Sequence, residues 1–291
     1  MSRRGWAELL VLAAMWGAVY PLIEVALRDL PPVIVVLGRV LLAALLLVPL
    51  AIRNGALGPL WKRPRAIVET ALVQSTAPLL LLTVGQQYVP SGIAGILVGA
   101  QPLFVAVLAL RFDPAERPQG WPGVLGILLG FAGLILLFGV DLRGGWHALL
   151  GGALVLVAAL GYATGSIMIH KRHADAQPLG VATSAMLVTT IATAVPAGLS
   201  LPDQVPSTAA LAAVGVLGIL CTGLPLVMFY TLIAQAGPAR AALAFYLSPA
   251  FAVAFGTIFL SEELTVSAVA GLAAIIAGSA LAARRAESVP T

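Results

Sequence analysis

The stretch Gln86–Gly133 decides the fold, and it reads QQYVPSGIAGILVGAQPLFVAVLALRFDPAERPQGWPGVLGILLGFAG. Its residues 92–110 carry no charge, and a run of about 20 apolar residues is enough to cross a bilayer as a helix. A short charged loop containing Glu116 follows, and then a second apolar run begins. This order predicts two consecutive transmembrane helices joined by a tight loop.

The same order of features returns further along the chain, in the stretch Gln235–Gly278. Pro102 matches Pro249 and Glu116 matches Glu263, each 147 positions on. Two more proline pairs keep that offset, namely Pro49 with Pro196 and Pro78 with Pro225. The chain is therefore predicted to be a duplication, with one repeat over residues 1–143 and a second over residues 144–291.

The composition is that of a membrane protein. Hydrophobic residues make up 60% of the 291 residues, only 10% are charged, and the mean hydropathy is +1.02. A soluble domain of this size needs far more charge on its surface, so an all-α integral membrane protein is predicted. Cys221 and three scattered histidines provide neither a disulfide framework nor a ligand cluster. No metal, cofactor or nucleic-acid partner is therefore expected, and the lipid bilayer is the expected surrounding.

Ten apolar runs are long enough to span a bilayer. They lie at roughly 6–27, 33–52, 66–86, 92–110, 120–139, 148–170, 178–198, 208–234, 240–260 and 265–283. Thirteen of the 16 Lys and Arg residues fall on one side of this arrangement and two on the other, with Arg39 inside a span. Basic loops stay in the cytoplasm, so both termini of a multi-pass protein of the plasma (inner) membrane are predicted to be cytoplasmic.

Each repeat contains five spans, an odd number, so the second repeat must be inverted relative to the first. The predicted fold is ten transmembrane helices arranged as two inverted five-helix repeats around a central cavity. This arrangement is typical of secondary transporters, although channels also contain inverted repeats. Two complete repeats could work as a monomer, and a dimer is the alternative.

The sequence resembles the drug/metabolite transporter superfamily, in its ten-helix EamA-type branch, over almost the whole chain. The likeness rests on the proline of the fourth span, the glutamate 14 residues later, the glycine-rich fifth span and the segment GRVLLAAL at Gly38–Leu45. It implies an exporter of small metabolites, including amino acids, that works through a central cavity by alternating access. The alternatives are a small-solute channel and a drug or quaternary-ammonium exporter of the same superfamily.

The resemblance raises the question of proton coupling. Small multidrug exporters of this superfamily use a buried glutamate in their first helix for proton exchange. Here Ala13, Ala14 and Met15 occupy the middle of that helix, so the usual residue is missing, although Glu24 could substitute. Facilitated export down a gradient is at least as well supported.

Arg39 and Glu24 are charged residues within spans, where charge is costly and usually functional. Arg39 lies near the middle of the second span, and Glu24, near the outer end of the first, is its expected partner. A role in substrate binding or gating is one interpretation. A structural ion pair, or a side chain that snorkels outward, is the other. The second repeat has no counterpart to Arg39, because the equivalent region reads ATSAMLVTT.

Polar and aromatic side chains at mid-depth, from spans of both repeats, are predicted to line the cavity and bind the substrate. The candidates are Trp16, Tyr20, Gln74, Ser75, Thr76, Gln101, Tyr162, Ser166, Thr222, Tyr246 and Ser248. Aromatic faces with a few amide and hydroxyl groups suit a small, partly apolar solute. Ordinary packing or a place in an interfacial aromatic belt is the alternative for each aromatic residue, and the mid-depth positions argue against the belt.

Prolines within spans are predicted hinges, because each removes a helix hydrogen bond, and a static kink is the alternative. They are Pro21, Pro78, Pro102, Pro225 and Pro249. The spacing of Gly126 and Gly130 predicts close helix contact. Glutamates at span ends, such as Glu69, Glu262 and Glu263, are expected to be solvated or to pair at helix termini.

An enzyme is not expected. Ser166 and His170 share a helix face, but the chain has no G-x-S-x-G motif and His170 lies at the edge of the span. A nucleotide-binding loop of the type G-x-x-x-x-G-K-[ST] is also absent, which argues against ATP-driven transport by this chain. The sequence thus predicts a carrier for a small-molecule substrate, and its uncharged cavity candidates argue against a multiply charged solute.

Overall fold

The computed structural model describes residues 3–58, 60–112, 118, 120–140, 145–229 and 243–282. Within these ranges every regular element is helical, so the all-α prediction is confirmed for them. Glu116, which matches Glu263 in the repeat comparison, lies outside the described residues.

The first half of the chain forms five rods, several of them interrupted. Their elements are α1 (Arg3–Gly17), α2 (Val19–Leu27), α3 (Pro32–Arg53), η1 (Leu60–Lys62), α4 (Pro64–Ala71), η2 (Leu72–Thr76), α5 (Ala77–Gly85), α6 (Ser91–Val98), α7 (Gln101–Phe112) and α8 (Gly120–Val140). The second half contains α9 (Trp146–Arg172), α10 (Pro178–Gly198), α11 (Thr208–Gly218), η4 (Ile219–Gly223), α14 (Leu243–Leu260) and α15 (Val266–Ala282). Both η2 and η4 are single π-helical turns inside longer helices.

Eight helices of the described chain are long and apolar enough to cross a membrane. They are Gly5–Leu27, Pro32–Arg53, Pro64–Gly85, Ser91–Phe112, Gly120–Leu137, Trp146–Arg172, Pro178–Gly198 and Thr208–Phe229. The first seven begin and end within two residues of the predicted spans. Two shorter apolar helices, Ala244–Leu260 and Val266–Ala282, lie where the ninth and tenth spans are predicted.

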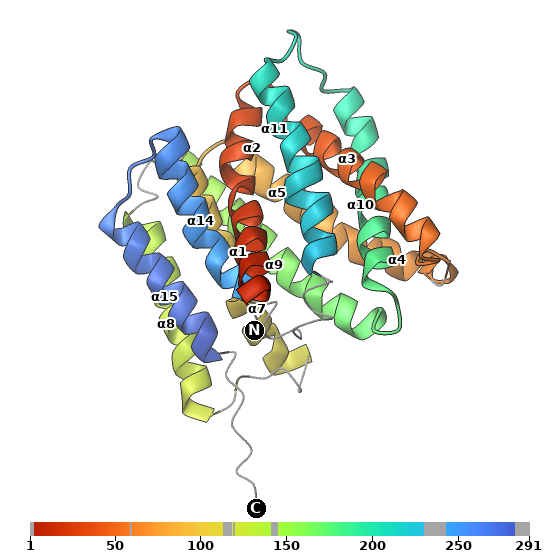
Figure 1. Cartoon of the computed structure of the whole chain (residues 1–291). Helices are drawn as coiled ribbons and strands as arrows, with labels where there is room; N and C mark the ends of the chain where they lie inside the picture. The colour runs from red at the N-terminus through yellow and green to blue at the C-terminus, as the bar shows by residue number, and fades with distance from the viewer. Residues whose placement is uncertain are drawn as a thin grey trace, which may run out of the picture.

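Helices of the two halves pack against each other throughout the bundle (Figure 1). The pair α8 and α15 lies along one edge, α3 packs on α10, α1 on α14, and α5 on α9. The start of α1 and the end of α15 lie toward the same end of the bundle (Figure 1). The halves are therefore interlocked rather than separate, while their inverted relationship and the boundary between residues 143 and 144 stay predictions.

The contact between α8 and α15 depends on glycine. A Cβ atom added to Gly278 would lie 2.5 Å from the backbone nitrogen of Gly130 and 2.6 Å from the carbonyl oxygen of Gly126. Only hydrogen fits at that distance, so the two backbones are in direct contact, as small-residue spacing in membrane helices predicts. This pair forms the peripheral edge of the bundle (Figure 1).

Four of the five predicted hinge prolines sit in the first turn after a break in their helix. Pro21 follows the break between α1 and α2, and Pro102 follows the break between α6 and α7. Pro78 and Pro225 follow the π turns η2 and η4. The first turn of a helix needs no N–H donor, so Pro21 and Pro102 are tolerated at the starts of α2 and α7, whereas Pro78 and Pro225 lie just after a π turn within a continuous helix. Pro249 differs, because α14 continues through it unbroken.

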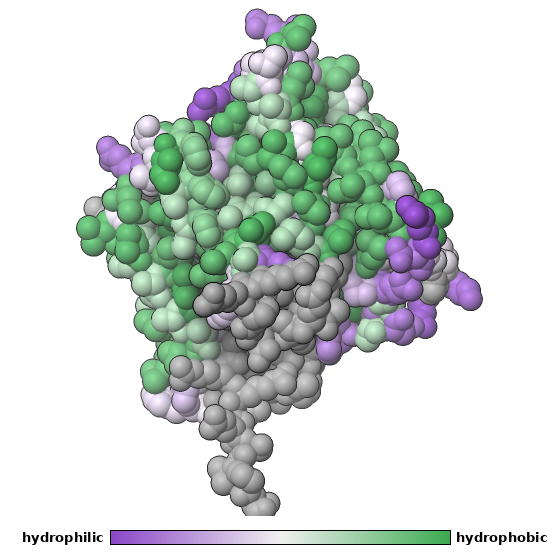
Figure 2. All heavy atoms as spheres, in the orientation of Figure 1, coloured by the Kyte–Doolittle hydropathy of each residue, from purple (hydrophilic) through white to green (hydrophobic). Residues whose placement is uncertain are grey.

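The lateral surface is apolar (Figure 2). Ile135 on α8 and Ile191 and Val195 on α10 are each 71% exposed, an unusual fraction for large apolar side chains in water. Hydrophilic residues gather toward the ends of the visible face, with hydrophobic residues between them (Figure 2). Such a band is what a bilayer would cover.

Candidate functional site

Arg39 is the centre of the candidate site. Its side chain on α3 is 7% exposed, and its Nε donates a 2.7 Å hydrogen bond to the hydroxyl of Thr222 in η4. The hydroxyl of Thr222 in turn donates to the carbonyl of Leu217 at 2.8 Å. Nη1 of Arg39 is buried and has no acceptor among the described residues. Nε is therefore held by Thr222, and Nη1 is buried without a partner among the described residues.

Local backbone structure brings Arg39 and Thr222 together. A Cβ on Gly218 would lie 2.9 Å from the carbonyl oxygen of Arg39 and 2.6 Å from the Cβ of Leu42, so the absence of a side chain at Gly218 lets α11 approach α3. The π turn η4 then begins at Ile219 and carries Thr222. Single π turns in helices often accompany functional sites.

The predicted pairing of Arg39 with Glu24 is wrong. The described residues show no ion pair for Arg39, whose electrostatic neighbours are Tyr20, Tyr162 and Cys221. Glu24 instead interacts with Glu262, in the loop between α14 and α15. The two charged side chains face different parts of the bundle, a fact that the position of each along its span does not reveal.

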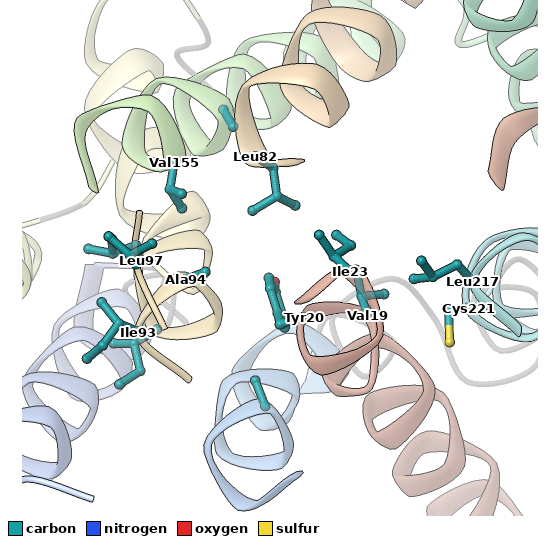
Figure 3. Packing of buried hydrophobic residues seen from close by; sticks show 14 of the residues in the cluster. Val19, Tyr20, Ile23, Leu82, Ile93, Ala94, Leu97, Val155, Leu217 and Cys221 are labelled. Atoms are coloured by element: carbon teal, nitrogen blue, oxygen red, sulfur yellow. The ribbon is translucent and has the colours of Figure 1, made fainter. Parts of the chain in front are cut away.

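Tyr20 lies in the main apolar core of the bundle (Figure 3). It is 6% exposed and packs among side chains that include Ile23, Leu82 and Leu97, while Val19 and Ile23 of the same helix lie toward Leu217 and Cys221 (Figure 3). The carbonyl of Tyr20 accepts a 3.0 Å hydrogen bond from the side-chain amide of Gln86.

Trp16, one turn earlier, belongs to a different cluster. Its ring stacks on Phe245 with 4.7 Å between the centroids, and Phe229 lies at 5.3 Å. The break between α1 and α2 separates Trp16 from Tyr20. The structure therefore does not bring these two aromatic candidates together, although they are one helical turn apart.

Two amide candidates from other helices, Gln101 and Gln74, contact α9, which carries the hydroxyl candidate Ser166. Gln101 donates to the hydroxyl of Ser166 at 3.5 Å, and Ser166 donates to the carbonyl of Tyr162 at 2.8 Å. Gln74 packs so closely against Gly165 that a Cβ there would clash with it, and its buried Oε1 has no partner among the described residues. Gln101 of α7 and Gln74 of η2 thus each contact α9, at the neighbouring residues Ser166 and Gly165.

The remaining hydroxyl candidates lie elsewhere in the bundle. Thr76 shares a 2.9 Å hydrogen bond with Thr189 of α10, next to the buried Ser75. Ser248 is buried on α14, where its carbonyl faces Gly17 of α1. Tyr246 is half-buried on the same helix. The eleven cavity candidates thus form several groups, and a single central cavity stays a prediction.

Glu262 pairs with a helix terminus, one of the two roles expected for it, but sequence reasoning did not identify which helix it contacts or its interaction with Glu24. It accepts hydrogen bonds from the backbone N–H groups of Ser91 at 2.6 Å and Gly92 at 2.8 Å, so it caps α6 and is not simply solvated. Glu24 interacts with Glu262, and the buried Oε2 of Glu24 has no hydrogen-bond partner among the described residues. The repeat comparison pointed to the next residue, Glu263, which is exposed.

A surface hollow of about 350 Å³ lies at the end of the third and sixth spans. Its lining includes Arg63, Arg65, Glu69 and Arg172, and Glu69 forms ion pairs with Arg65 at 2.8 Å and Arg172 at 2.6 Å. The ion pairs agree with the expectation that Glu69 pairs at a helix terminus. The hollow is basic, but its position at the helix ends makes it distinct from the predicted cavity.

The described residues contain no group of three or more His, Cys, Asp or Glu side chains placed to hold a metal ion. The polar groups that are buried without partners are instead amide, hydroxyl, carboxyl and guanidinium atoms.

The chain is similar to proteins that are named as transporters or exporters. The chain is 31% identical to an uncharacterized inner membrane transporter, YedA, of Escherichia coli over 277 residues, which cover 89% of this chain and 84% of that protein. It is 28% identical to a probable terminal-alkyne amino-acid exporter of Streptantibioticus cattleyicolor, covering 98% and 95% of the two chains. One solved crystal structure has a TM-score of 0.69 at 18% identity and covers 97% of both chains, which supports the same fold.

A family model matches the chain twice, over residues 4–139 and again over residues 149–284. Together the two matches cover nearly all of the sequence, and each holds five of the predicted spans. The protein belongs to the EamA-like transporter family.

Proposed function

We propose that the protein is a secondary transporter that exports small organic solutes, amino acids or related metabolites, by alternating access. Family membership makes it a membrane transporter. The finer proposal of amino-acid export is supported by the names of two relatives, a probable amino-acid metabolite efflux pump of Escherichia coli and the terminal-alkyne amino-acid exporter.

One observation carries the proposal. The π turns Leu72–Thr76 and Ile219–Gly223 lie 147 positions apart, which is the offset of the sequence repeat. Both place a buried threonine hydroxyl inside the bundle, and both precede a proline. A weakened helix turn, repeated in the two halves, provides equivalent bending points on both sides of a central site.

The helix contacts support the same mechanism. The first span packs on the ninth, and their counterparts in the other repeat, the sixth and the fourth, also pack on each other. The third span packs on the sixth, and their counterparts, the eighth and the first, do the same. The second and seventh spans pack on each other, as do the fifth and tenth. We infer two inverted repeats, residues 1–143 and 144–291, because the paired contacts fit a twofold relation between the halves and five spans per repeat turn the second one over. The excess of Lys and Arg on one side supports a cytoplasmic location for both termini.

Transport is tested with purified protein in proteoliposomes. Vesicles preloaded with one unlabelled amino acid at a time should accumulate the labelled form by counterflow, and initial rates should saturate. The same panel with and without a pH gradient measures proton coupling. Flux that rises linearly with concentration and lacks counterflow would instead support a channel.

A further inference from the structure

We propose that Arg39 binds the carboxylate of the transported solute, with Thr222 holding the guanidinium in place, so that the substrates are small monocarboxylates. This inference rests on the proposed transport function and adds the substrate class and the residue that recognises it.

The first argument is the cost of the charge. An arginine side chain within a transmembrane helix is expensive, and such residues almost always pair with another charged group or with carbonyls. Arg39 is more than nine-tenths buried, forms no ion pair with a described carboxylate, and leaves Nη1 without an acceptor. A purely structural arginine would have its donors satisfied. The missing acceptor is what an anionic ligand would supply.

The second argument is geometry. Nε is already engaged by Thr222 at 2.7 Å, which fixes the plane of the guanidinium. With Nε engaged, the edge formed by the two terminal nitrogens, which includes the unpartnered Nη1, can pair with both oxygens of a carboxylate through two parallel hydrogen bonds. Thr222 comes from the second half of the chain and Arg39 from the first, so a ligand at this edge would contact a junction between the halves.

The third argument is the chemistry of the surroundings. Tyr20 and Tyr162, from helices of the two halves, and Cys221 are close enough to interact electrostatically with Arg39. None of them carries a negative charge at neutral pH, and the tyrosine hydroxyls can donate hydrogen bonds. Glu24, the carboxylate first expected here, is directed to Glu262. One buried positive charge matches one carboxylate and disfavours cations, such as quaternary ammonium compounds, and multiply charged anions.

The experiment compares matched solutes and matched variants in proteoliposomes. Each amino acid of the panel is tested beside its amide, which has nearly the same shape and lacks the carboxylate. The variants are Arg39→Gln, Arg39→Lys, Thr222→Val and the control Arg53→Gln, which removes an exposed arginine from the end of the same helix. Thermal stabilisation of the purified protein by each solute measures binding separately from transport.

The wild type should transport at least one amino acid about 10- to 100-fold better than its amide, in line with the strength of hydrogen bonds to charged groups. Arg39→Gln should lose that preference. Arg39→Lys should keep a reduced preference, because lysine retains the positive charge but lacks the planar pair of N–H donors of the guanidinium. Arg53→Gln should equal the wild type. Thr222→Val should weaken binding less than Arg39→Gln.

Equal transport of acid and amide by the wild type, or an unchanged preference in folded Arg39→Gln and Arg39→Lys, would overturn the inference and leave the transport function standing. Carboxylate-dependent stabilisation that Arg39→Gln abolishes, without any transport, would overturn the transport function and leave the site standing. Absence of both transport and stabilisation for every carboxylate would overturn both.

Discussion

The carboxylate of Glu262 accepts a 2.6 Å hydrogen bond from the backbone N–H of Ser91, a residue 171 positions earlier in the chain. The same carboxylate accepts from Gly92, so it satisfies two of the free N–H groups at the start of α6. A loop of the second half thereby caps a helix of the first half. The interaction connects α14 and α15 with α6 at one end of the bundle.

Replacement of Glu262 by Ala should destabilise the protein by about 1–3 kcal/mol, because two partly buried N–H groups lose a charged acceptor. Thermal unfolding in detergent measures the effect. Glu263→Ala is the matched control, since Glu263 is adjacent and exposed. Equal melting temperatures for the two variants would show that the cap contributes nothing to stability.

Replacement of Gly278 by Val should separate α8 from α15, because the added side chain would overlap the backbone of Gly126 and Gly130. Overpacking of this kind costs about 1–3 kcal/mol or more. Gly215→Val is the control, since a Cβ at Gly215 meets nothing within 4 Å. The melting temperatures of both variants provide the comparison, and a stable Gly278→Val protein would contradict the close contact.

His173 should make stability depend on pH. It is buried just beyond the end of α9, with Nε2 3.1 Å from the hydroxyl of Thr70. Burial lowers the pKa of its imidazole below the usual value, so the unfolded chain binds the proton more readily than the folded one. Stability from this group is full above about pH 6.5 and is lost as the pH falls toward the lowered folded pKa.

Thermal melts between pH 7.5 and pH 5 measure this dependence. His173→Gln should flatten the part of the profile below about pH 6.5, where an ordinary histidine titrates. His170→Gln, which removes an exposed histidine three residues earlier, should leave the profile unchanged. An identical slope in the wild type and in His173→Gln would assign the pH dependence to other groups.

Inversion of the repeats predicts the sidedness of two equivalent loops. Asn54 and Leu201 lie 147 positions apart, after the second and seventh spans, and both are exposed. In a Cys221→Ala background, Asn54→Cys should react with a membrane-impermeant maleimide only from the cytoplasmic side. Leu201→Cys should react only from the opposite side. Labelling of both from one side would contradict inversion.

The limits of most apolar helices could be predicted from the sequence because hydrophobic length is a local property, whereas eight of the ten predicted spans are long enough to cross a membrane within the described residues. The first seven spans begin and end where the apolar runs do, and four prolines mark breaks that are also local. The spacing of Gly126 and Gly130 also predicted a close helix contact, which the structure confirms, although it did not identify α15 as the partner.

The candidate site was only partly predictable. Arg39 and Thr222 were both identified as intramembrane polar residues, but their partnership was not, and Glu24 was assigned to Arg39 in error. Polarity at mid-depth identifies a residue worth attention, whereas its partner depends on the rotation of each helix about its axis. That rotation is set by packing against neighbours from the other half.

The sequence by itself predicted a duplicated membrane bundle and the limits of most of its spans, because hydrophobic runs and repeat offsets are read directly from the order of the residues, and its motifs resembled those of the family. Only the tertiary structure decided that Thr222 holds Arg39, that Glu262 caps α6, and that Trp16 and Tyr20 belong to different clusters. These relationships join residues up to 183 positions apart. They arise from helix crossing and rotation, which no single helix specifies.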